Sequence, residues 1–170
     1  LQQIEFVGRD KGPRRIHCVS NPCTLKINEV VVGVTAPDAL FHMSMNETNA
    51  NLEPGSRLCR ISQHLLQQRS YHPLFPAAAN LDIKHADQWK MPCAPDVLIL
   101  PSKLAPFAQT VLNGTIVVNS GPLTRETTGG TYASLSIHPM ARETLENAGG
   151  GDVEIKHNVR DRTRVEIKRI

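Results

Sequence analysis

The sequence predicts a mixed α/β domain in which short strands dominate and a few short helices flank them. Three observations lead to this fold class. Several short runs are rich in Val, Ile and Thr, or alternate apolar with polar residues, as strands do. One longer segment instead repeats its apolar residues with helical spacing. No internal repeat and no linker of biased composition divides the 170 residues, so residues 1–170 are expected to form one unit.

The amino-terminal part is predicted to form strands after an initial loop. Residues 1–15 are polar and basic, and we expect a loop or a partly ordered segment there. Residues 16–20 are a first strand candidate. Residues 24–27 alternate like a half-buried strand, and the β-branched run 30–35 reads as a buried one. The two residues between them can form a tight turn, so the pair is predicted to be a β-hairpin.

Two helices are expected next. Asp38 can accept hydrogen bonds from the free amides of a short helix over residues 39–43. Ser56 is the candidate N-cap of a longer helix that begins at Arg57 and ends at about Arg69. The apolar residues of this helix fall on one face; they are Leu58, Ile61, Leu65 and Leu66. Residues 44–55 and residues 77–95 are expected to be loops.

The middle of the chain predicts two buried strands. Residues 96–100 form a continuous apolar run of the kind that is buried on both faces of a sheet, and residues 115–119 form another. Between them, residues 103–112 are predicted to include a short helix, which Pro106 confines to its first turns.

The last part of the chain predicts further strands. Residues 131–138 alternate like an antiparallel strand after a turn at 120–122. Residues 139–151 give no core signal and are expected to be a loop. Residues 153–159 and 163–170 alternate on either side of a charged turn, so the chain is predicted to end in a hairpin.

Composition excludes several classes of protein. The net charge of +3 is too small to indicate nucleic-acid binding by itself, and no run of 18 apolar residues exists that could span a membrane. Direct binding of single-stranded DNA would require aromatic residues beside the basic segments 9–15 and 160–169, and neither segment has one. The four cysteines are expected to be free and mostly buried thiols; they are Cys18, Cys23, Cys59 and Cys93.

The sequence contains no assembled active site. None of the seven histidines forms a pair with the i, i+4 spacing of a helical zinc site. His64 and His42 are expected to be partly buried core residues, whereas His138 and His157 are expected on the surface of strands. The glycine pair at 129–130 more often marks close backbone packing than phosphate binding. No catalytic residue, metal or other cofactor is therefore predicted.

Three stretches, in order, carry a resemblance to a known family. Residues 19–42 include Ser-Asn-Pro-Cys-Thr-Leu-Lys-Ile-Asn and Val-Gly-Val-Thr. Residues 67–76 read Gln-Gln-Arg-Ser-Tyr-His-Pro-Leu-Phe-Pro, and 95–104 read Pro-Asp-Val-Leu-Ile-Leu-Pro-Ser-Lys-Leu. Val-Asn-Ser-Gly-Pro-Leu-Thr and Gly-Gly-Thr-Tyr-Ala follow at 118–133. Together they resemble the accessory (B) subunits of eukaryotic replicative DNA polymerases, and the B subunits of polymerase alpha more than those of delta or epsilon.

This resemblance implies a fold and the loss of an activity. The fold would be the later half of a calcineurin-like phosphoesterase domain, a two-sheet β-sandwich with flanking helices. Active relatives of that fold bind two metals, and their late ligand motif is Gly-His-x-His just after a strand. This sequence has Leu100-Pro101-Ser102-Lys103-Leu104 at the matching place. Leucine, proline and a cationic lysine cannot supply neutral imidazoles, so the resemblance implies an inactive phosphoesterase.

The resemblance also implies a role in initiating DNA replication in the nucleus. The chain would belong to a scaffold that binds the carboxy-terminal zinc-module domain of the polymerase alpha catalytic subunit and reaches primase indirectly, with weak or indirect DNA contact. A metal-dependent phosphodiesterase or nuclease, and a B subunit of polymerase delta or epsilon, are the alternatives. The candidate partner-binding residues lie in two segments, although both could instead close over the domain's own core; they are Tyr71, His72, Pro73, Leu74, Phe75, Pro101, Ser102, Lys103 and Phe107.

Overall fold

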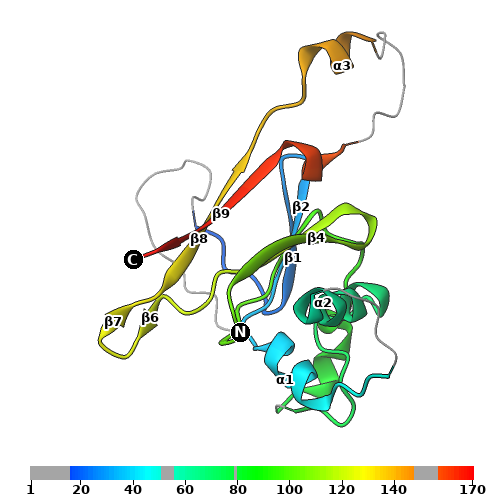
Figure 1. Cartoon of the computed structure of the whole chain (residues 1–170). Coiled ribbons are helices and arrows are strands. Elements are labelled where there is room, and N and C mark those ends of the chain that lie inside the picture. The colour runs from blue at the N-terminus through cyan, green and yellow to red at the C-terminus, as the bar shows by residue number, and fades with distance from the viewer. Residues whose placement is uncertain (1–15, 51–55, 79, 148–156) are drawn as a thin grey trace, which may run out of the picture.

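A five-stranded mixed sheet forms the centre of the structure, a computed structural model that describes residues 16–50, 56–78, 80–147 and 157–170 (Figure 1). The strands lie in the order β1-β2-β3-β5-β4. Their bounds are β1 (Cys23–Ile27), β2 (Val30–Val34), β3 (Val97–Ile99), β4 (Phe107–Val111) and β5 (Thr115–Asn119). β2, β3 and β5 are parallel, and the two outer strands β1 and β4 run antiparallel to their neighbours.

The predicted amino-terminal hairpin is confirmed. β1 and β2 pair antiparallel across a two-residue turn, with Ile27 opposite Val30. Asn28 takes a left-handed φ of 54° in this turn, a conformation that asparagine tolerates better than most residues. The strand predicted at residues 16–20 is wrong. Those residues are irregular, and Ile16 and Val19 are exposed to solvent, so they have no core to pack against.

The two buried strands are also confirmed, and each one divides its side chains between two cores. Successive side chains of a strand point to opposite faces. Leu98 and Val117 therefore enter the core on one face of the sheet, and Val97, Ile116 and Val118 enter the core on the other. This explains why both segments read as continuous apolar runs.

Helices α1 (Ala39–Asn46) and α2 (Arg57–Gln67) cover one face of the sheet (Figure 1). Asp38 caps α1 as predicted, because its carboxylate accepts a hydrogen bond from Phe41 N at 2.9 Å. Ser56 stands at the N-cap of α2 but makes no side-chain capping bond. The core on this face combines both helices with the sheet, and its largest fully buried side chains include Leu40, Ile61, Leu65, Leu98 and Tyr71. No helix in the described ranges is long and apolar enough to cross a membrane.

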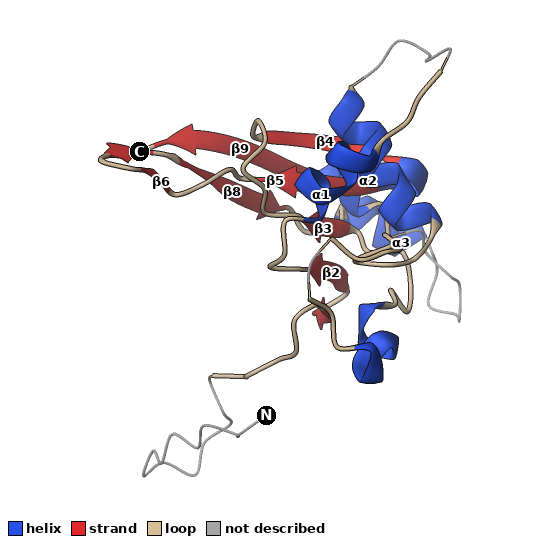
Figure 2. Cartoon of the chain, turned by 90° about the horizontal axis from the view of Figure 1, so that it is seen from below, coloured by secondary structure: helices blue, strands red, loops and turns tan. Residues whose placement is uncertain are grey.

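A two-stranded sheet covers the opposite face. β8 (Thr131–Ile137) pairs antiparallel with β9 (Thr163–Arg169) over their full length. Ala133, Leu135 and Val165 on its inner face pack against the core around Val97 and Val118. Figure 2 shows β8 and β9 running side by side as a pair of long strands.

The predicted closing hairpin is therefore wrong in its pairing. The partner of β9 is β8, which lies well before it in the chain. Residues 159–162 form a 3₁₀ helix, η3 (Val159–Arg162), instead of the end of a strand. Val159 is buried in the core beneath β8 and β9, which accounts for the apolar signal there. Residues 153–156 of the predicted hairpin lie outside the described residues.

The helix predicted within residues 103–112 is wrong as well. Phe107–Val111 is β4, which pairs antiparallel with β5 through the short 3₁₀ turn η2 (Leu112–Gly114). Gly114 takes a φ of +89° there, which favours glycine. Pro106 directly precedes the strand. Pairing with a buried neighbour strand outweighs the weak helical signal of this segment.

Several small elements lie where no helix or strand is predicted. The 3₁₀ helix η1 (Ile83–Trp89) and helix α3 (Arg142–Asn147) fall in segments expected to be loops. β6 (Thr124–Arg125) and β7 (Thr128–Gly129) form a small hairpin before β8. The glycine pair has the expected packing role. A Cβ on Gly130 would lie 2.0 Å from Pro122 O, and one on Gly129 would lie 2.5 Å from Ile170 O.

The fold class predicted from the sequence is confirmed. The chain is a mixed α/β structure with more than one sheet and flanking helices, consistent with part of a phosphoesterase-like fold.

Candidate functional site

The carboxyl ends of the parallel strands β2, β3 and β5 meet at one edge of the sheet, where open α/β sheets usually bind ligands. The segments that follow these strands are residues 35–38, 100–106 and 119–122. Both predicted partner-binding segments are built around this edge, which is therefore the candidate functional site.

Asn119, at the end of β5, holds the loops of this edge together. Its side chain is fully buried. Oδ1 accepts hydrogen bonds from Ser102 N at 3.0 Å and Gly121 N at 2.9 Å. Nδ2 donates to Leu104 O at 3.2 Å and Ala105 O at 3.1 Å. All four bonds that the amide can make are thus directed to backbone, and none is left for a ligand.

Asp38 connects helix α1 to the loop after β3. One carboxylate oxygen caps α1, and the other accepts a hydrogen bond from Lys103 N at 2.9 Å. The Lys103 ammonium lies 3.4 Å from the centroid of the Phe41 ring, a cation–π contact. A positive charge therefore lies over Phe41 at this edge of the sheet.

Two imidazole rings lie next to this contact. His42 on α1 and His72 are 6.0 Å apart between ring centroids and nearly perpendicular. Neither His42 Nδ1 nor His72 Nε2 has a hydrogen-bond partner in the described structure, and both atoms are buried. Burial lowers the pKa of His72 below its usual value, and the neighbouring His42 lowers it further. Burial of the imidazole disfavours its charged form, so the folded protein resists protonation of His72.

Tyr71 fixes the segment that carries His72 to the first hairpin. Its hydroxyl donates a hydrogen bond to Cys23 O at 3.1 Å and is 2.7 Å from the Thr24 hydroxyl. Burial raises the pKa of Tyr71, and the hydrogen bond with Thr24 opposes this effect. The hydroxyl passes over Gly33 in β2, where a Cβ would lie 2.6 Å from Tyr71 Oη.

The nine predicted partner-binding residues divide by exposure. Tyr71, His72 and Ser102 are buried and serve the internal packing and hydrogen bonding of the loops. Pro73, Leu74, Pro101 and Phe107 are half-buried, and Leu74 and Phe107 pack against the helix-side core. Phe75 and Lys103 are exposed, and the Phe75 side chain is 97% accessible. The accessible part of the predicted surface is therefore Phe75, Lys103 and the half-buried residues beside them.

The remaining candidate side chains differ in part from expectation. His64 is exposed on α2 and is not the partly buried core residue that the sequence predicts, because the apolar face of α2 turns it away from the sheet. His42 is partly buried and His138 is exposed, as predicted. The four cysteines are free, but none is fully buried, contrary to the prediction.

His157 is predicted to be exposed but is half-buried between two carboxylates. Its Nε2 lies 3.3 Å from Glu29 Oε2, and its Nδ1 lies 3.9 Å from Asp96 Oδ2. The imidazole therefore joins the segment before β9 to the β1–β2 turn and to the start of β3.

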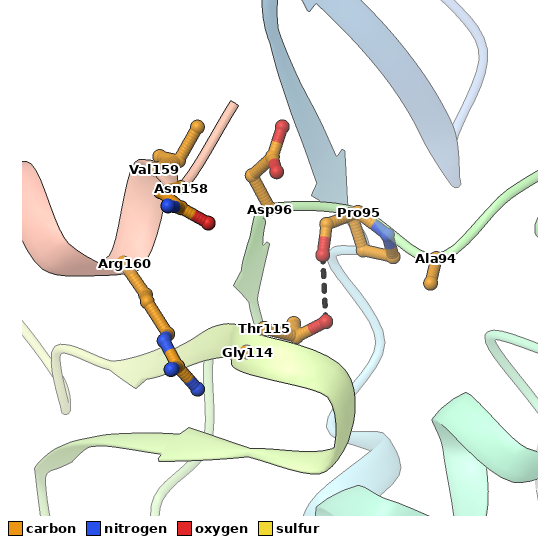
Figure 3. Close-up of a pocket in the computed structure, with 8 residues that line it drawn as sticks. All are labelled: Ala94, Pro95, Asp96, Gly114, Thr115, Asn158, Val159 and Arg160. Carbon is orange, nitrogen blue, oxygen red and sulfur yellow. Dashed lines mark hydrogen bonds between the residues drawn. The ribbon is translucent and has the colours of Figure 1, made fainter. Parts of the chain in front are cut away.

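A cavity of about 360 Å³ opens at the opposite, amino edge of the sheet, next to His157 (Figure 3). Figure 3 shows Asn158, Val159 and Arg160 on one side and Asp96 with Pro95 on the other. The Thr115 hydroxyl donates to Pro95 O at 2.7 Å, and Asp96 Oδ2 accepts from Val31 N at 2.8 Å. The Thr115 hydroxyl and Asp96 Oδ2 therefore each have a backbone partner.

Sequence reasoning does not find the role of Asn119. The available signal is an amide side chain at the end of a buried strand, because a buried polar group must find hydrogen-bond partners. The Asp38 cap can be predicted from the sequence, but the bond from Lys103 N to Asp38 joins two segments distant in the sequence and has no local signature.

Across the described residues, no three His, Cys, Asp or Glu side chains are grouped so that they could hold a metal ion.

Comparison with known proteins gives a consistent result. The family model for the B subunit of DNA polymerase alpha/epsilon matches residues 2–109. The B subunit of DNA polymerase alpha from Mus musculus is 36% identical over 81% of this chain and 23% of its own length. The corresponding protein of Schizosaccharomyces pombe is 36% identical over 93% of this chain and 28% of its own length. That of Bos taurus is 41% identical over 61% of this chain and 18% of its length. The chain thus spans about a quarter of the length of these relatives.

Proposed function

Because the chain belongs to the family of B subunits of DNA polymerases alpha and epsilon, we propose that it forms part of a non-catalytic scaffold in a polymerase alpha–primase complex. The mouse, fission yeast and bovine relatives are all named as B subunits of DNA polymerase alpha, which favours alpha over delta or epsilon. In this role the scaffold binds the carboxy-terminal zinc-module domain of the catalytic chain and acts in the nucleus, where DNA replication begins. Its link to primase is indirect.

The non-catalytic part of the proposal rests on one observation: polar side chains at the carboxyl edge of the sheet bind the backbone of the surrounding loops. Asn119 and Asp38 are committed to backbone hydrogen bonds. The Lys103 ammonium lies over Phe41 in the segment where active phosphoesterases would place histidine ligands. A cation at this place repels metal ions, and the Asn119 amide oxygen, which already accepts two hydrogen bonds, cannot coordinate a metal without releasing a loop. These residues do not fit a di-metal centre.

The exposed Phe75 supports the binding part of the proposal. Its side chain is 97% accessible, yet its neighbours Tyr71 and His72 are buried and hydrogen-bonded or packed. A large apolar side chain held in water on a fixed segment resembles the anchor residues of protein interfaces. We assign Phe75 as the side chain that enters the partner, with the half-buried Pro73 and Leu74 preceding it in the same segment.

This assignment is tested with the full-length subunit and the carboxy-terminal domain of the catalytic chain. Phe75→Ala is expected to weaken binding by about tenfold or more, the size typical of an interface anchor. Leu145→Ala is the matched control, because Leu145 is 51% accessible and lies on the separate helix α3. Equal affinities for the wild-type protein and Phe75→Ala, measured by calorimetry, would place the partner on another surface of the protein.

The absence of catalysis is tested separately. The purified full-length subunit is incubated with labelled single-stranded DNA and manganese, with and without a chelator. We expect no chelator-sensitive cleavage. Cleavage that disappears with the chelator and persists through purification would reject the scaffold assignment in favour of a metal-dependent nuclease.

A further inference from the structure

The outer face of the β8–β9 sheet combines an aromatic residue from β8 with basic residues from β9. The inner face is apolar and packs on the central sheet. Alternation along the strands directs the intervening side chains outward. They form three cross-strand pairs: Tyr132 opposite Lys168, Ser134 opposite Glu166, and Ser136 opposite Arg164.

The outer face carries an excess of positive charge. Lys168 and Arg164 both contact Glu166, so one carboxylate is shared between two cations. The side chains of Lys168 and Arg164 are 48% and 72% accessible, which leaves both able to contact a ligand. The hydrogen bond to Glu166 raises the pKa of Lys168, so this ammonium stays charged at neutral pH. The small side chains Ser134 and Ser136 leave space beside the cations.

The aromatic residue that β9 lacks is supplied by β8. Tyr132 is 43% accessible and stands directly opposite Lys168. An exposed aromatic ring beside cations on a sheet is the arrangement with which proteins bind single-stranded nucleic acid, since bases stack on the ring and phosphates contact the charges. Taken alone, the basic segment at 160–169 argues against direct binding of single-stranded DNA because it has no aromatic residue. The pairing of β9 with β8 changes that premise.

We propose that the outer face of β8 and β9 binds single-stranded nucleic acid, with Tyr132 stacking on a base and Lys168 and Arg164 contacting phosphates. The strip from Tyr132 to Ser136 is about 13 Å long at the usual rise of a strand, so it contacts only a few nucleotides. Binding is expected to be independent of sequence, because every base offers a face for stacking. Duplex DNA hides its base faces and is expected to bind less tightly.

The test uses the full-length subunit and a fluorescent oligothymidylate, with binding followed by fluorescence anisotropy at low salt. Tyr132→Ala is expected to weaken binding by at least about fivefold, the lower bound for loss of one stacked base. Tyr132→Phe retains the ring and should bind like the wild-type protein. Lys168→Ala should reduce the slope of log affinity against log salt by about 0.7, the value for one phosphate contact to a single strand.

Lys84→Ala is the matched control for charge, because Lys84 is exposed on η1 and lies on a different element. It should change the affinity less than Lys168→Ala. The proposal is overturned by an absence of binding at low salt, or by Tyr132→Ala binding as tightly as Tyr132→Phe. Thermal unfolding of each variant confirms that loss of binding does not reflect loss of structure. Neither outcome depends on whether a polymerase catalytic chain associates with the protein.

Discussion

Asn119 is the side chain on which the loops at the carboxyl edge of the sheet depend most. It is buried, and its four hydrogen bonds reach the loops after β3 and β5. Removal of such a group leaves several buried backbone groups without partners, and each unpaired group costs free energy.

Asn119→Ala is therefore expected to lower the free energy of unfolding by about 2–4 kcal/mol, in the upper range for point mutations. Asn119→Asp should also destabilise the protein, because it replaces two donors with a buried charge. Asn80→Ala is the control, since Asn80 is exposed. Urea denaturation of the full-length subunit measures all three, and similar midpoints for the Asn119 and Asn80 variants would contradict this role.

The His42–His72 pair predicts a dependence of stability on pH. The pKa of His72 is lowered in the folded protein, chiefly by burial and also by His42; Phe41 lies beside His42, and the Lys103 ammonium lies over the Phe41 ring. Below the unfolded value of about 6.5, the unfolded chain binds a proton that the folded protein resists, so stability falls as the pH decreases from there toward the lower folded pKa. His72→Gln should flatten this fall between about pH 7.5 and pH 5. His64→Gln changes an exposed histidine on α2 and should leave the fall in stability unchanged. Thermal unfolding at a series of pH values measures both variants. An equally steep fall in His72→Gln would show that other groups cause it.

At the scale of elements, Tyr71 joins the segment that carries His72 to the β1–β2 hairpin. A Cβ on Gly33 would lie 2.6 Å from Tyr71 Oη and 3.1 Å from Leu98 Cδ1. Tyr71→Phe should cost about 1 kcal/mol, because the Thr24 hydroxyl and Cys23 O lose a partner.

Gly33→Ala tests this packing directly. It should destabilise the wild-type protein by about 1–3 kcal/mol through overpacking. The cost should be smaller in the Tyr71→Phe background, where the colliding oxygen is gone, and the difference is the coupling energy of the pair. Tyr132→Phe removes an exposed hydroxyl and should be neutral. Additive effects of Gly33→Ala and Tyr71→Phe would mean that the two residues do not pack as described.

The elements that can be predicted from sequence are those whose signal is local. The hairpin of β1 and β2, the doubly buried strands β3 and β5, the Asp38 cap and helix α2 each follow from periodicity or capping within a short window. The errors concern pairing between distant segments. β4 is a strand because β5 lies beside it, and β9 pairs with β8 across an intervening segment. Likewise, the residues around Tyr71 in the sequence do not indicate that its side chain is buried against Thr24 and Gly33. They also do not indicate that Phe75 is the exposed residue of this segment.

For the whole molecule, the central sheet separates two surfaces with different chemistry. Helices α1 and α2 and the segment from Tyr71 to Phe75 lie on one face, where Phe75 is exposed beside buried residues. The β8–β9 sheet lies on the other face and turns its cations and Tyr132 outward. A scaffold can use such a division to contact a protein partner and a nucleic acid at the same time.

The most direct test of the scaffold proposal is the mass of the complex in solution. The full-length subunit is co-expressed with the carboxy-terminal domain of the polymerase alpha catalytic chain, and size-exclusion chromatography with light scattering gives the mass of the eluted species. We expect a single peak with the mass of one scaffold protein and one catalytic domain, stable on dilution. Two separate peaks with the masses of the free proteins would contradict the central claim.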